Sequence, residues 1–427
     1  MRLSDTLTRA KRDLPDVPGP VRMYVCGPTV YARAHIGNAR PFVIGMWLRR
    51  WLAARGYEAT LVHNITDIND KIYDAAPGAS AELAARASEW YLEDTRDFGL
   101  GMPDHQPKAS DVIPQMIAAI EELIARGYAY DVDGDVYYRV AKFGEYGQLS
   151  GQRPDQVEEQ EPNPRKEDAR DFALWKANKP GEDTWWDSPW GRGRPGWHIE
   201  CSVMAEQLLG PAFEIHGGGL DLVFPHHENE IAQSHALGHP FAKVWMHNGM
   251  LRPVGHAKMS KSEGNFETIR DAIDRWGRET LLVFFLTGHW SKPIDYSDET
   301  LRSAEARADS LREVFRNPSE DAADGEWDRF VAALDDDFNT PEALAIMHSW
   351  RDHDLLRRAL DVFGLASLAD EEAAPPDVIE LATRRQEART SGEFAEADRL
   401  RGEIAERGWT VRDVADGFQL VRTTRAA

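Results

Sequence analysis

The stretch VRMYVCGPTVYARAHIGN, residues 21–38, decides which fold this chain can adopt. Its first part, Val21 to Cys26, is apolar and rich in β-branched side chains and stops at Gly27-Pro28, which predicts a strand that ends in a loop. A helical pattern follows from about Asn38 to Arg55, and Thr60 to Ile65 predicts a second strand. Strand, helix and strand in this order are typical of a parallel sheet.

The rest of the chain divides into parts of different pattern. A helical stretch over Ala81 to Phe98 continues the α/β alternation, which resumes near Trp197. Between these parts, a helix over Val112 to Arg126 and a hairpin over Tyr128 to Val140 predict an insertion. From Ser297 onward, leucine and alanine recur at helical spacings.

The predicted fold class is therefore α/β, with a parallel-sheet domain split by an insertion and followed by an all-α C-terminal domain. We expect the first half of the split domain at residues 1–107, the insertion at 108–194, the second half at 195–296 and the helical domain at 297–427.

Composition excludes several classes of protein. With 427 residues, 42% hydrophobic and 29% charged, the chain is expected to be a globular protein of several domains. No apolar stretch approaches the roughly 20 residues of a membrane span, and the N-terminus lacks the apolar core of a secretion signal, so we expect a cytoplasmic protein without membrane contact. The net charge of −22 argues against nucleic-acid binding, although local arginine clusters such as Arg384-Arg385 leave it open. The spacing of the arginines within Leu381 to Arg407 could place several of them on one helical face that meets the phosphates of a nucleic acid.

Two motifs suit a polyphosphate. The helix that begins after His35-Ile36-Gly37-Asn38 presents free N–H groups, and Gly37 permits close approach to the backbone. The segment Lys258-Met259-Ser260-Lys261-Ser262 carries two ammonium groups close together. The simpler alternatives are a helix-capping histidine and a solvated basic turn.

A third set of residues suits a metal ion. His226 and Glu230 are four residues apart and share one face of a helix, and Cys26 and Cys201 can complete four ligands. Such a donor set favours Zn²⁺ over Mg²⁺ or Ca²⁺. The alternatives are two buried free thiols and a structural His-Glu pair.

These motifs belong to longer strings that occur in a fixed order. The strings are MYVCGPTVY (23–31), NITDI (64–68), PGWHIECS (195–202), HGGGLDL (216–222), FPHHENE (224–230) and KMSKS (258–262). Together they resemble the cysteinyl-tRNA synthetase family of class I aminoacyl-tRNA synthetases. The resemblance implies a Rossmann-type catalytic domain and a C-terminal helical domain that binds tRNA.

The resemblance also implies an activity and its residues. L-cysteine is expected to be activated with ATP and Mg²⁺ to cysteinyl-adenylate and transferred to the 3′ end of cysteine tRNA by a monomer holding one Zn²⁺. The implied zinc ligands are Cys26, Cys201, His226 and Glu230. The implied catalytic residues are His35, Asn38, Lys258 and Lys261, which also bind ATP together with Gly37, Gly217, Gly218 and Asp221. The implied amino-acid contacts are Thr66, Trp197 and His198.

Three departures from the family pattern accompany the resemblance. Asn38 stands where the family has a second histidine, which predicts slower ATP turnover, and Asn69 replaces an aspartate. The helical domain is expected to be shorter between Met347 and Leu360. Two alternative functions remain open: a cysteine ligase of the mycothiol-pathway type that uses a small amine, and a decayed paralogue that only binds tRNA.

Overall fold

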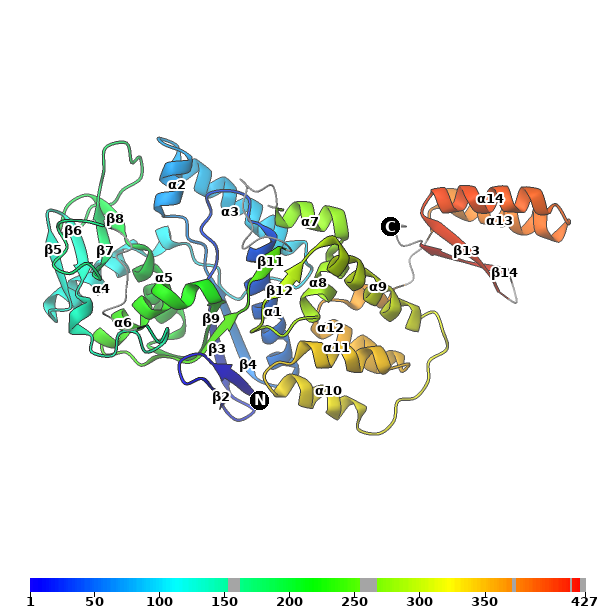
Figure 1. The fold of residues 1–427 in the computed structure, drawn as a ribbon, viewed down its shortest axis with the longest axis horizontal. Helices are drawn as coiled ribbons and strands as arrows, with labels where there is room; N and C mark the ends of the chain where they lie inside the picture. Colours follow the sequence, from blue (N-terminus) through cyan, green and yellow to red (C-terminus); the bar gives the residue numbers. More distant parts are fainter. Residues whose placement is uncertain (153–161, 254–266, 371–373, 415–416, 423–427) are drawn as a thin grey trace.

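The structure is a computed structural model that describes residues 1–427 except 153–161, 254–266, 371–373, 415–416 and 423–427 (Figure 1). Its central sheet has the strand order β10-β9-β3-β4, and all neighbouring strands are parallel. The strands are β3 (Pro20–Val25), β4 (Glu58–His63), β9 (Ala212–Gly219) and β10 (Phe241–Asn248). The predicted parallel sheet is confirmed.

The order of these strands indicates where a ligand would bind. β3 pairs with β4 on one side and with β9 on the other, so the chain changes direction across the sheet between β3 and β9. Ligands of open parallel sheets bind outside the carboxyl ends of the strands at such a point. Cys26 follows β3 directly, and Gly217 to Gly219 end β9. Cys26 and Gly217 therefore lie at the same carboxyl edge of the sheet.

Helix α1 (Ala39–Ala54) connects this edge to the C-terminal half of the protein. Trp47 and Trp51 are almost fully buried and make edge contacts with the rings of Phe363 and Phe330. The indole N–H of Trp47 also donates a hydrogen bond of 3.0 Å to the Phe363 carbonyl oxygen. α1 therefore packs against the sheet with one face and against later helices with another. The other helices of this part are α2 (Asp70–Ala75), α3 (Ser80–Arg96), α5 (Trp197–Leu209), α6 (Glu228–Ala236), α7 (Ile269–Trp276) and α8 (Arg278–Leu286).

The insertion contributes α4 (Ile113–Ala125) and an antiparallel sheet of order β5-β6-β7-β8. Its strands are β5 (Ala129–Val132), β6 (Asp135–Tyr138), β7 (Phe172–Ala177) and β8 (Gly193–Pro195). Asp133 and Gly134 join β5 to β6 with φ of 52° and 86°, the two left-handed residues of a type I′ hairpin. The predicted hairpin is confirmed.

Among the residues that the structure describes, three short strand pairs lie outside these sheets. β1 (Arg2–Asp5) pairs with β2 (Ala10–Asp13), and β11 (Leu251–Pro253) pairs with β12 (Ile294–Tyr296). The third, β13 (Trp409–Val414) with β14 (Gly417–Arg422), corrects the expectation of an all-α C-terminal domain. Trp409 and Val411 are buried against helices α13 and α14, because alternate residues of β13 face the small core of this unit.

The C-terminal region is otherwise helical, as expected. It comprises α9 (Asp298–Val314), α10 (Glu326–Asp335), α11 (Thr340–Ser349), α12 (His353–Val362), α13 (Pro376–Thr390) and α14 (Phe394–Glu406). In Figure 1 the unit of α13, α14, β13 and β14 stands apart from the other helices, at the far right. In the described part of the chain, no helix has the length and apolar character needed to cross a membrane.

Candidate active site

A buried cluster of sulfur, imidazole and carboxylate groups lies at the carboxyl edge of the sheet. Cys26 comes from the end of β3, Cys201 from α5, and His226, His227 and Glu230 from the turn into α6 and its first turn. The Cys26 Sγ lies 3.7 Å from the Cys201 Sγ, 3.4 Å from the His227 Nε2 and 3.9 Å from a Glu230 oxygen. The His226 Nε2 lies 3.1 Å from the same Glu230 oxygen.

These separations suit one tetrahedral metal ion. Zn²⁺ binds sulfur at about 2.3 Å and nitrogen or oxygen at about 2.0–2.2 Å, so its donor atoms lie about 3.3–3.8 Å apart. The spacings above fall close to that range. The donor atoms of Cys26, His226, His227 and Glu230 lie within 4.8 Å of one another. The residues present therefore fit a zinc ion.

The structure brings together three of the four residues expected to bind metal, Cys26, His226 and Glu230, and adds His227. The fourth, Cys201, lies beside Cys26 but is not among the donors that are all within 4.8 Å of one another. Phe224 has an extended backbone (φ −137°, ψ 133°), so the turn before α6 is not a regular helix. Both histidines are fully buried within the cluster. The spacing of His227 to Glu230, three residues, is also a same-face spacing in a helix, and this signal could have identified it.

Burial favours the uncharged form of four groups in the cluster. It raises the pKa of the Cys26 thiol and of the Glu230 carboxyl, and it lowers the pKa of His226 and His227. A divalent cation would reverse this balance for the thiol and the carboxyl, because it stabilises their anions. The outer Glu230 oxygen lies 2.8 Å from the His216 Nε2, which orients the carboxylate.

Two of the expected amino-acid contacts, Trp197 and His198, lie against this cluster. The Trp197 ring stacks on the His226 ring with centroids 4.1 Å apart, and the His198 Nδ1 is 3.1 Å from the His226 Nδ1. Trp197 and His198 also line a cavity of about 310 Å³, together with Thr29. Thr66 is buried and accepts a hydrogen bond of 3.2 Å from the Asn64 side chain.

The expected phosphate-binding turn lies on the same loop as Cys26. His35 caps the 3-10 helix Ile36–Asn38, and its Nδ1 accepts a hydrogen bond of 3.1 Å from the Gly37 N–H. A Cβ on Gly37 would lie 2.8 Å from the His35 ring, so this turn requires glycine. Burial lowers the pKa of His35, and the nearby Asp221 carboxylate partly opposes the shift. The structure thus brings Asp221 close to His35.

The remaining residues expected to bind ATP are Asn38, two glycines of β9 and two lysines. The Asn38 side chain makes no capping hydrogen bond at the start of α1. Gly217 and Gly218 are buried at the end of β9, where a Cβ on Gly218 would lie 2.9 Å from Leu222 and 3.0 Å from the His227 ring. Lys258 and Lys261 lie outside the described residues.

Asn69, which had no physical interpretation in the sequence, has one in the structure. Its side chain accepts a hydrogen bond of 3.1 Å from the Lys71 N–H and so caps helix α2. Asparagine and aspartate are comparably good at this position. The departure from the family pattern at Asn69 therefore preserves the local structure.

Comparison with known proteins adds an independent line of argument. The family described as "tRNA synthetases class I (C) catalytic domain" matches residues 15–306. The families "DALR domain" and "Cysteinyl-tRNA ligase anticodon binding domain" match residues 329–353 and 372–422.

Curated relatives match over nearly the whole chain. A cysteine–tRNA ligase of Caldicellulosiruptor saccharolyticus is 41% identical over 465 residues, which cover 99% of this chain and 100% of the relative. One of Alkalilimnicola ehrlichii is 44% identical over 464 residues, with 98% of each chain covered.

Solved structures resemble the fold at low identity. Mycobacterium tuberculosis methionyl-tRNA synthetase bound by methionyl-adenylate has a TM-score of 0.57 at 15% identity, covering 83% of this chain and 86% of that one. A leucyl enzyme of Agrobacterium radiobacter K84, in a ternary complex with tRNA, has a TM-score of 0.58 at 11% identity, covering 84% and 83%. These likenesses concern the fold alone.

Proposed function

Because the chain belongs to the cysteinyl-tRNA synthetase family of class I aminoacyl-tRNA synthetases and acts as a cysteine–tRNA ligase, we propose that its buried Cys-His-Glu cluster selects the amino acid. The observation that carries this proposal is the convergence of Cys26, Cys201, His226, His227 and Glu230 from three separate segments at the carboxyl edge of the sheet.

In the proposed site, Cys26, Cys201, His226 and Glu230 hold Zn²⁺, and His227 is a further donor within reach. When bound, the ion deprotonates a thiol and holds it as a soft anion, whereas a hydroxyl such as that of serine is a far poorer ligand. Trp197 fixes the plane of the His226 ring by stacking. The cavity beside Trp197 and His198 gives the amino acid a place next to the cluster.

ATP is proposed to bind across the start of α1 and the end of β9. The Gly37 N–H donates to the His35 Nδ1, so the neutral ring carries its proton on Nε2 and can donate that hydrogen to a phosphate oxygen. The first N–H groups of α1 add partial positive charge. Gly217 and Gly218 leave room for the nucleotide, and Lys258 and Lys261 are proposed to contact the phosphates.

The reaction then needs no nucleophile from the protein. The carboxylate of L-cysteine attacks the α-phosphate of ATP, the bond to the pyrophosphate leaving group breaks, and cysteinyl-adenylate forms. A terminal ribose hydroxyl of cysteine tRNA next attacks the carbonyl carbon, and AMP leaves. The protein contributes positioning and electrostatic stabilisation of the phosphate oxygens.

The C-terminal unit is proposed to recognise tRNA, but the expected arginine-rich face does not support this role. An arginine-rich face was expected within Leu381 to Arg407, but most of these arginines are paired inside the unit. Arg385 is buried and binds Asp413, as does Arg389, and Arg399 binds Glu396 and Glu403. Contacts with tRNA must therefore use other groups or rearranged ion pairs.

The test of the proposed site is a comparison of two amino acids and two acceptors. We expect the zinc-loaded enzyme to support ATP–pyrophosphate exchange with L-cysteine and far less with L-serine, and to charge cysteine tRNA. Cys26→Ser should remove the exchange. An enzyme that activates serine as well as cysteine would contradict the role of the cluster, and one that joins cysteine to a small amine but never to tRNA would favour a small-amine ligase.

A further inference from the structure

We propose that Asp94 is a positioning residue for the ATP-dependent step: a buried carboxylate that fixes the loop carrying His35 against helices α3 and α7. The inference rests on the proposed contact of His35 with ATP. It assigns a role to a residue that touches neither the metal cluster nor the cavity beside Trp197.

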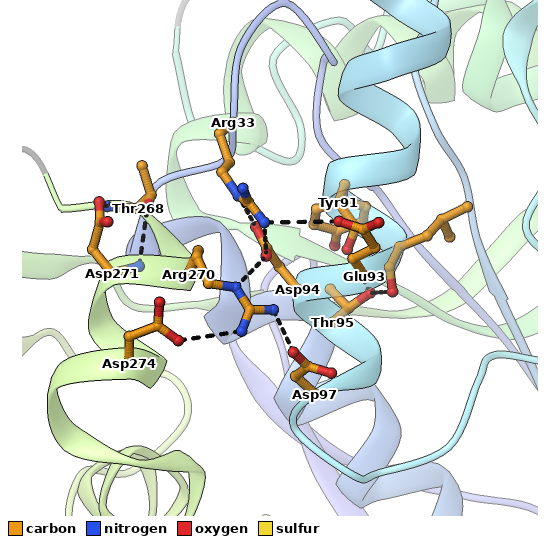
Figure 2. Close-up of polar contacts among 11 residues, drawn as sticks. Arg33, Tyr91, Glu93, Asp94, Thr95, Asp97, Thr268, Arg270, Asp271 and Asp274 are labelled. Atoms are coloured by element: carbon orange, nitrogen blue, oxygen red, sulfur yellow. Dashed lines mark hydrogen bonds and ion pairs between the residues drawn. The ribbon is translucent and has the colours of Figure 1, made fainter.

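Asp94 joins two arginines from distant parts of the chain. Its carboxylate is fully buried in helix α3. Arg33 binds it with two hydrogen bonds, Nε to Oδ2 at 2.9 Å and Nη2 to Oδ1 at 2.7 Å. Arg270 of α7 donates its Nε–H to the same carboxylate at 3.3 Å. Figure 2 shows Asp94 between the two guanidinium groups. Such a bidentate contact fixes direction as well as distance.

Two of the three segments that meet here, the His35 turn and the start of α7, are also joined by their backbones. The Ile36 N–H donates to the Glu267 carbonyl oxygen at 3.0 Å, and the Ile269 N–H donates to the Ala34 carbonyl oxygen at 2.9 Å. Arg33 and Arg270 therefore flank a short bridge between the His35 turn and the first turn of α7. Asp94 forms ion pairs with both cations at the point where the bridge forms.

Helix α3 is held in place by contacts with the central sheet. One turn before Asp94, the Tyr91 hydroxyl lies 2.7 Å from the His63 Nε2, and the other nitrogen of His63 lies 2.9 Å from the Val25 carbonyl oxygen. α3 is thus tied to β4 and to the end of β3. The ion pairs of Asp94 transmit that fixed position to the loop that follows β3.

The neighbouring acids lack this combination of burial and reach. Asp97 and Asp274 form ion pairs with Arg270 but not with Arg33. A Glu93 oxygen lies 3.9 Å from the Arg33 Nη2. Their side chains are 46%, 63% and 59% exposed, so solvent screens these contacts. They are therefore matched controls with the same partners.

The test measures ATP–pyrophosphate exchange with the zinc-loaded enzyme and titrated active sites. For Asp94→Asn we expect kcat/KM for ATP to fall by about 10²-fold, the usual effect of a misplaced binding group, while KM for cysteine is unchanged. Asp97→Asn should stay within about fivefold of the wild type, because its ion pair is exposed. Arg33→Met should reproduce the loss, and combining it with Asp94→Asn should add little.

Each other outcome would overturn the inference. A purely structural Asp94 would lower the melting temperature and the fraction of active enzyme, but the folded enzyme would keep its KM for both substrates. If Asp94→Asn does not fold, Arg33→Met decides: unchanged ATP kinetics in that variant reject the proposal. The variant His35→Ala tests the proposed contact of His35 with ATP separately from the positioning role of Asp94. Normal ATP kinetics in His35→Ala would reject the contact of His35 with ATP.

Discussion

Replacing Cys201 with serine should weaken zinc binding far more than it changes the fold. The Cys201 Sγ lies 3.7 Å from the Cys26 Sγ, close to the separation of about 3.8 Å expected for two thiolates on one tetrahedral zinc ion. Serine keeps the volume of the side chain within one atom but is not deprotonated near neutral pH. The substitution therefore removes a ligand and leaves the packing of α5 almost unchanged.

The magnitude follows from the place of Cys201 in the cluster. Loss of a group that only orients a ligand costs about 10–100-fold in metal affinity, so loss of a ligand should cost more than about 100-fold, or about 2.7 kcal/mol. The graded comparison is His216→Gln, because His216 contacts the outer oxygen of Glu230 and should fall within the 10–100-fold range. Ser202→Ala is the control, since Ser202 binds Gln233 instead of the cluster.

Zinc affinity is measured by competition with a chromophoric chelator, and zinc content by elemental analysis. We expect one zinc per chain in the wild type. Undiminished zinc in both Cys26→Ser and Cys201→Ser would refute the metal site. Equal losses for Cys201→Ser and Ser202→Ala would show that the effect comes from the packing of α5.

Three further predictions concern other parts of the molecule. Burial opposes the shift, but the positive charges of Lys176 and Arg194 lower the pKa of Asp70 to about 2, so Asp70 stabilises the fold above about pH 4 and loses that effect as the pH falls through 2. Asp70→Asn should cost about 1 kcal/mol at pH 7 in denaturant unfolding, and this cost should disappear as the pH falls through 2. Trp47→Ala should lower the unfolding free energy by about 3–5 kcal/mol, because Trp47 is buried and hydrogen-bonded between α1 and the later helices, and a loss under 1 kcal/mol would contradict that packing. Lys261→Ala should slow adenylate formation by about 10²–10⁴-fold in pyrophosphate exchange while cysteine affinity stays constant, and a joint fall would mean a structural role.

Local pattern was enough to predict the parallel sheet and most of the metal cluster. The apolar run before Cys26 and the alternation of strand and helix follow directly from burial on both faces of a parallel sheet. The pairing of His226 with Glu230 follows from helical spacing. His227 was missed because only the four-residue spacing to Glu230 was considered, although a three-residue spacing also shares one face of a helix.

Contacts between distant segments were beyond the same reasoning. The arginines of α13 and α14 were expected to form an open basic face, but Arg385 and Arg389 turn toward Asp413 of β13, a strand that had been taken for helix. The contact of Arg33 with Asp94 spans 61 positions and that of Arg270 with Asp94 spans 176. No periodicity within one element reports such pairs.

The loop between β3 and α1 connects the buried Cys-His-Glu cluster to the turn that is proposed to bind phosphate. A Cβ on Gly27 would lie 1.7 Å from the Asn64 carbonyl oxygen, so only glycine lets the loop approach the segment after β4. Thr66 donates its N–H to the Pro28 carbonyl oxygen, and Val30 donates its N–H to Thr66, both at 3.1 Å. Cys26 begins this pinned loop and His35 ends it. If the thiol binds at the cluster and the nucleotide at His35, as proposed, this loop keeps them at a fixed separation, which is what an attack of carboxylate on α-phosphate requires.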